Sequence, residues 1–91
     1  MKATTKDGFT CEIDQDALGD WEIVERLVAI QGGNYADMPA VITELIGADG
    51  YQAMKDHVRN EKGRVPTEKM MQLFFDIMTA ARETAPEDKK K

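Results

Sequence analysis

Few side chains in this sequence could do chemistry, and each lacks the neighbours that the chemistry needs. His57 is the only histidine, and a histidine acting as a general base needs a nucleophile or a carboxylate held against it. Lys55, Asp56 and Arg59 surround it in the sequence, and no spacing along the chain indicates such a partner. We therefore interpret His57 as a structural or surface residue, and we predict no catalytic residue and no enzymatic activity.

The single cysteine and the paired glycines do not form the common cofactor motifs. Cys11 alone cannot form an internal disulfide, and one thiol with one histidine falls short of a structural zinc site. Gly32-Gly33 is not followed by the Gly-Lys-Ser/Thr of a phosphate-binding loop. We expect Cys11 to be a small, core-facing strand residue, and we expect no cofactor and no bound metal.

Charge is unevenly distributed along the chain, which has a formal net charge of -5. Residues 12–49 contain nine acids and one base, Arg26, whereas residues 50–91 contain nine bases and seven acids. Because phosphate contacts need a basic surface, the acidic half argues against nucleic-acid binding. Two interpretations of this half stay open: a solvated helix surface, or an acidic docking face for a basic partner.

The last predicted helix contains the best candidates for partner contacts. Its apolar stripe is formed by Met70, Leu73, Phe74, Ile77, Met78 and Ala81. Met71 and Phe75 are an i, i+4 pair at or beyond the edge of that stripe. Because methionine and phenylalanine at such an edge often make adaptable contacts, Met71 and Phe75 are candidate partner-binding residues. The alternative is that both side chains are buried in a core that extends beyond the stripe.

Residues 2–13 have the pattern of a β-hairpin. Strand-favouring residues stand on both sides of Asp7-Gly8, which would supply the positive-φ pair of a type I′ turn. Two strands alone are marginally stable in water, so the hairpin must pack on helices or pair with another chain. Its free edges are one expected contact of a homo-oligomer.

Four helices are expected after the hairpin, at about residues 17–31, 37–46, 50–61 and 67–83. Apolar side chains cover about half the circumference of the first, which predicts a central helix packed on two sides. These side chains are Trp21, Ile23, Val24, Leu27, Val28 and Ile30. Gly47 and Gly63 should end the second and third helices. The expected caps of the last three helices are Asp37, Asp49 and Thr67.

These elements predict an α+β, mainly α fold, in which an N-terminal β-hairpin packs on a bundle of about four helices. Residues 1–84 should form a single globular domain, and residues 85–91 a disordered polar tail. The N-terminus has no apolar secretory core, and no apolar run approaches membrane-spanning length. We therefore expect a cytoplasmic protein that does not bind a membrane.

The order of several short segments carries a family resemblance that covers about residues 9–81. These segments are Glu12-Ile13-Asp14, Asp20-Trp21-Glu22, Leu45-Ile46-Gly47, Gly50-Tyr51, Lys55 to Arg59, and Gly63-Arg64-Val65-Pro66 ahead of Met70. In this order the chain resembles the small tail assembly chaperones of long-tailed bacteriophages and prophages, particularly those of Gram-positive hosts. The resemblance depends on the order of many weak signals and not on one diagnostic motif.

The resemblance implies a function that residue chemistry alone does not indicate. Proteins of this family are non-enzymatic, coat the tape measure protein before the tail tube polymerises, and recruit the tail tube subunit. The resemblance therefore implies these two partners, a location in the cytoplasm of the bacterial host, and absence from the mature virion. Two other classes stay open: a structural head–tail or minor tail component, and a small prophage regulatory protein.

Overall fold

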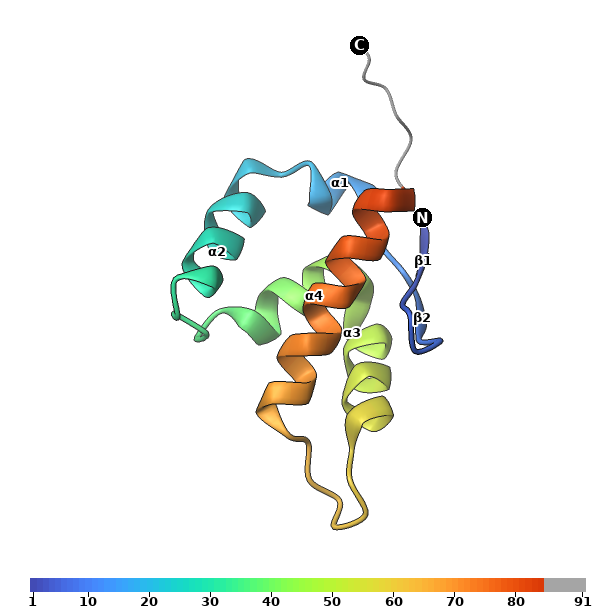
Figure 1. Cartoon of the computed structure of the whole chain (residues 1–91). Coiled ribbons are helices and arrows are strands. Elements are labelled where there is room, and N and C mark those ends of the chain that lie inside the picture. Colours follow the sequence, from blue (N-terminus) through green and yellow to red (C-terminus); the bar gives the residue numbers. More distant parts are fainter. Residues whose placement is uncertain (85–91) are drawn as a thin grey trace.

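The computed structural model of this chain describes residues 1–84, which are mainly helical with an N-terminal β-hairpin (Figure 1). In chain order the elements are β1 (Lys2–Thr4), β2 (Thr10–Glu12), α1 (Gln15–Leu18), α2 (Trp21–Gln31), α3 (Met38–Val58) and α4 (Thr67–Thr84). The hairpin packs against the helices, which confirms the predicted α+β, mainly α fold. The predicted disordered tail, residues 85–91, lies outside the described residues.

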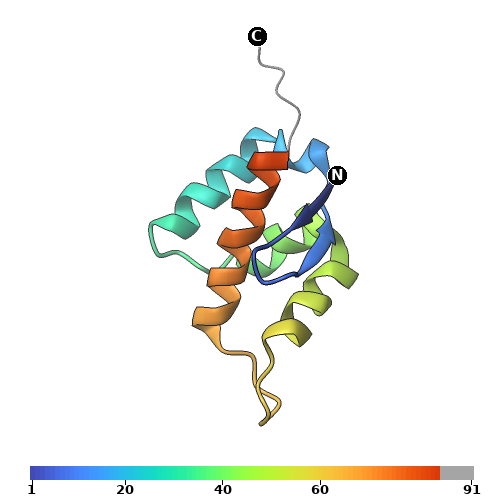
Figure 2. The ribbon, with the colours of Figure 1, turned by 45° about the vertical axis from the view of Figure 1, so that its right-hand side comes forward.

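The hairpin lies beside α4 and α3, with its short strands antiparallel (Figure 2). Ala3 pairs with Cys11 in the centre of the ladder, and both side chains are buried. Cys11 is therefore the core-facing strand residue that the sequence predicts. Packing on helices gives the two strands the support that they need. Pairing of their free edges with another chain stays a prediction.

The turn of the hairpin differs from the predicted type I′ turn. Gly8 has a positive φ of 93°, but Asp7 does not, since within residues 1–84 only glycines have a positive φ, so Asp7 cannot occupy the first position of such a turn. Thr5 and Phe9 close the loop instead, with the Thr5 amide donating to the Phe9 carbonyl at 2.8 Å. The three-residue loop requires a left-handed conformation only at Gly8.

The predicted helix at residues 17–31 is two helices, and its predicted central position is wrong. The first begins at Gln15 and ends at Leu18, and a side-chain oxygen of Asp20 then accepts from the Glu22 amide at 2.9 Å. This bond makes Asp20 the N-cap of a second helix, α2, because it satisfies an amide that has no helical partner. Only Ile23 and Ile30 of α2 are buried, so the helix lies at the edge of the fold.

The predicted helices at 37–46 and 50–61 are the two halves of α3. Gly47 interrupts the helix as predicted, with φ 83° and ψ 164°, and the chain resumes helical geometry directly after it. Asp49 therefore lies inside α3 and does not cap a separate helix. The Leu45 carbonyl, just before the kink, accepts from the Asp14 amide at 2.8 Å. The kink thus fastens the start of α1 to the middle of α3.

Helix α4 lies between the hairpin and α2 and supplies the centre of the core (Figure 1). Its predicted stripe is confirmed, because Leu73, Phe74, Ile77 and Ala81 are buried, while Met70 and Met78 are half-buried. Thr67 is the first helical residue and not the cap that was predicted. The largest fully buried side chains are Phe74, Ile23, Ile30, Leu45, Met54, Ile77 and Val41. Among residues 1–84, no helix combines the length and the apolar character needed to cross a bilayer.

Candidate functional site

An apolar groove with a volume of about 240 Å³ lies between α3, the start of α4 and the loop before α3. Its lining is almost entirely hydrophobic and contains three methionines and two tyrosines. The lining residues are Tyr35, Met38, Pro39, Ile42, Tyr51, Val65, Thr67, Met70 and Met71. Open apolar concavities of this kind are where proteins bind apolar side chains of partners. The groove is therefore the candidate functional site.

The kink at Gly47 and the loop after α3 position the lining. Ile42 precedes the kink and Tyr51 follows it, so both halves of α3 contribute to one groove. In the loop, the Asn60 side-chain oxygen accepts from the Lys62 amide at 2.9 Å and from the Arg64 amide at 3.0 Å. This loop leads directly into Val65 and α4, which close the groove.

The two residues predicted to bind a partner lie in different places relative to the groove. Met71 is half-buried and lines the groove. Phe75 is also half-buried, but it is not in the lining, and its ring lies 5.7 Å from that of Phe74 between centroids. Both side chains pack partly against the core, as their position at the edge of the stripe indicates. Their role in partner binding stays a prediction.

A second apolar surface lies on α2, where sequence reasoning expected core. Trp21 is 70% exposed and Val28 is 62% exposed, whereas Val24 between them is half-buried. The sequence contains one signal for this exposure. An apolar arc of half the circumference is wider than a single neighbour covers, and within the described residues α2 contacts one long helix, α3, and the four-residue α1.

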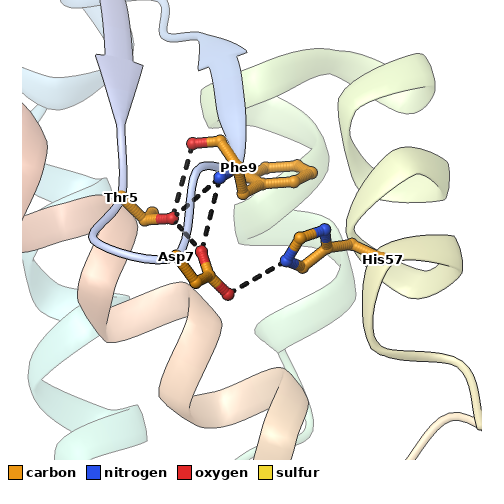
Figure 3. A network of polar contacts seen from close by, with 4 residues as sticks. All are labelled: Thr5, Asp7, Phe9 and His57. Carbon is orange, nitrogen blue, oxygen red and sulfur yellow. Dashed lines mark hydrogen bonds and ion pairs between the residues drawn. The ribbon is translucent and has the colours of Figure 1, made fainter.

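The hairpin turn is joined to α3 by a polar network that sequence spacing did not indicate (Figure 3). His57 Nε2 lies 3.0 Å from Asp7 Oδ2, so the fold supplies the carboxylate that no local motif supplied. The Thr5 hydroxyl donates to Asp7 Oδ1, and the Phe9 amide is shared between Asp7 at 3.3 Å and the Thr5 hydroxyl at 3.1 Å. The Phe9 ring lies 5.0 Å from the imidazole between centroids.

This network holds a charged carboxylate in place. The hydrogen bond from Thr5, and next the bond to His57, lower the pKa of Asp7 from 3.8 to about 2. Asp7 stands between the hydroxyl and the imidazole, whereas a hydrolytic triad places the histidine between the nucleophile and the acid. The contact between His57 and Asp7 thus ties the turn of the hairpin to α3.

Cys11, the single thiol of the chain, is not in the lining of the groove. Burial raises the pKa of the Cys11 thiol, which keeps it protonated and weakly nucleophilic. Within residues 1–84, no group of three or more histidine, cysteine or acidic side chains could hold a metal ion. The groove and the exposed face of α2 are apolar surfaces of the described residues.

Comparison of the chain with family models, with curated proteins and with solved structures gave no match. The functional interpretation accordingly depends on the geometry of the groove and on the resemblance seen in the sequence.

Proposed function

We propose that this chain is a non-enzymatic tail assembly chaperone of a long-tailed phage or prophage. In this role it holds apolar helical segments of the tape measure protein until the tail tube subunit polymerises around them. The observation that carries the proposal is the methionine-lined groove between α3 and α4. A tape measure protein is long and helical, so it exposes apolar helix faces that need a temporary cover before assembly.

The chemistry of the groove supports a client of varied sequence. Methionine is flexible and polarizable, so Met38, Met70 and Met71 could adapt to different apolar side chains. Tyr35 and Tyr51 add aromatic surface at the same site, and aromatic residues are enriched where proteins bind one another. A chaperone that coats a long client contacts segments of many different sequences. A lining of flexible side chains does not require any particular one of these sequences.

The test is to co-express the chain with a fragment of the tape measure protein of the same phage or prophage. We expect the wild type to keep the fragment soluble and to elute with it in gel filtration. Met71→Glu should release the fragment, because it places a carboxylate in the apolar groove without a partner. Thr79→Glu is the matched control, since it adds the same charge at an exposed position of α4 outside the groove.

Two outcomes would contradict the proposal. In the first, the fragment is equally soluble, or equally aggregated, with and without the chain. In the second, the chain is found in mature tails at a stoichiometric level by mass spectrometry, which would favour a structural tail component. Circular dichroism of Met71→Glu would show whether its helices are intact, so that lost binding is not mistaken for unfolding.

A further inference from the structure

The exposed face of α2 combines an apolar stripe with unneutralised acids. At 3.6 residues per turn, Trp21, Val24 and Val28 lie within an arc of about 60°. Glu25 is four residues after Trp21 and three before Val28, so its carboxylate borders both exposed side chains. This face is separate from the groove, whose lining contains no residue of α2.

The charges on α2 make this face negative. Arg26 is the only base of the helix, and its guanidinium is paired with Glu44 of α3 at 2.9 Å. Asp20, Glu22 and Glu25 take part in no ion pair within residues 1–84. Any partner that covers the stripe therefore meets carboxylates around an apolar centre.

We propose that this face binds a cationic amphipathic helix, which carries lysine or arginine beside its apolar residues. The stripe spans two turns with i, i+3, i+7 spacing, which is the surface against which another helix packs. Lysine or arginine at the rim would pair with Glu22 and Glu25. A cation over the Trp21 indole would gain a further cation–π contact, for which tryptophan is the best side chain.

A second copy of the chain does not fit this face symmetrically. Two α2 stripes packed on each other would bring Glu22 and Glu25 of both copies together. No cation would stand between them, because Arg26 is already paired with Glu44. Like charges at such close range oppose association, so the occupant has to bring positive charge. This inference does not depend on the proposed function, because it concerns a different surface.

Trp21 makes the test direct, because it is the only tryptophan of the chain and lies in the proposed interface. The probe is a synthetic helix of leucine and lysine with no aromatic residue, titrated into the full chain. We expect a saturable blue shift of the tryptophan emission as the exposed indole is covered. A helix of the same pattern with glutamate in place of lysine should give no shift. Raising the salt from about 0.05 M to about 0.5 M should weaken the binding several-fold.

Variants at exposed positions separate this surface from general attraction between acid and base. Glu25→Lys should weaken binding of the lysine helix by about fivefold or more, because it turns an attraction at the rim into a repulsion. Glu61→Lys is the matched control, an equal charge reversal in the loop at the far end of the molecule from α2 (Figure 1). It should change the affinity less than twofold.

Three results would overturn the proposal. Equal weakening by Glu25→Lys and Glu61→Lys would mean that the helix is attracted only by net charge. A blue shift with the glutamate helix would mean that cations are not selected. A shift that follows the concentration of the chain alone would identify the occupant as a second copy, and sedimentation would then show the oligomer.

Discussion

The hairpin end of the molecule and helix α2 are both attached to the same core, but they are attached in different ways. The hairpin buries the side chains on its inner face and ties its turn to α3 through Asp7 and His57. Helix α2 buries only Ile23 and Ile30 and leaves its largest side chain, Trp21, 70% exposed. Its polar tie, between Arg26 and Glu44, is an exposed ion pair that contributes little.

This difference teaches where the molecule can interact. At the hairpin end, the apolar side chains of the inner face are buried, and Thr5, Asp7 and His57 are hydrogen-bonded to one another, so we expect little gain from binding another protein there. At α2, apolar surface remains in water beside free carboxylates. The groove between α3 and α4 resembles α2 in this respect, since Met70 and Met71 of its lining are only half-buried. We therefore expect stability and recognition to be served by different parts of the fold.

The largest expected effect is at the hairpin end. Phe9→Ala should lower the free energy of unfolding by about 3–5 kcal/mol, because it removes a buried ring that packs on His57. Denaturant unfolding followed by circular dichroism measures the loss. A loss below about 1 kcal/mol would mean that the hairpin is only loosely attached, and the comparison with α2 would fail.

Removal of a buried side chain of α2 should cause the next largest loss of stability. Ile30→Ala should cost about 2–5 kcal/mol, because the side chain is 1% exposed and its removal leaves a cavity in the core. Hydrogen exchange of the α2 amides would sharpen the comparison: they should exchange before those of α4 in the wild type and faster still in the variant. Exchange of α2 and α4 at one common rate would contradict a separate, weaker attachment of α2.

The contacts of Asp7 with Thr5 and His57 should make the stability of the fold depend on pH. Because the pKa of Asp7 is lowered from 3.8 to about 2 in the folded chain, its carboxylate stabilises the fold above about pH 4. That contribution is lost as the pH falls from about 4 through about 2, and only below about 2 is Asp7 protonated in both states. Asp7→Asn should therefore lose less stability than the wild type between these two values, as measured by urea midpoints. Parallel curves would show that Asp7 gains nothing from Thr5 and His57.

The smallest expected change in the free energy of unfolding is that of replacing Trp21, the largest side chain of α2. Trp21→Ala should change the free energy of unfolding by less than about 0.5 kcal/mol, because the indole is mostly in solvent in the folded chain. Phe9→Ala, measured under the same conditions, is the matched comparison of two aromatic residues. A loss for Trp21→Ala near that of Phe9→Ala would place α2 in the core after all, as its sequence pattern first predicted.

Local signals predicted those parts of the fold whose cause is local. The conformational freedom of glycine placed the break at Gly47, and strand propensity placed the hairpin. The stripe of α4 was predicted because a single helix face with regular spacing can point in only one direction, toward the core. Of the candidate site, Met71 was found as a stripe-edge residue, but the groove around it was not. Besides Thr67 and Met70 of α4 itself, its other lining residues come from α3 and from two loops.

The sequence by itself determined the fold class, the hairpin, the break in α3 and the buried face of α4, because each follows from backbone propensity or side-chain period. Only the tertiary structure decided which faces are covered. An apolar arc on α2 looks the same whether one neighbour or two pack on it, so the exposure of Trp21 depended on where α1 and α3 lie. Likewise, Asp7 and His57 are 50 residues apart, and only the docking of the hairpin on α3 brings them together.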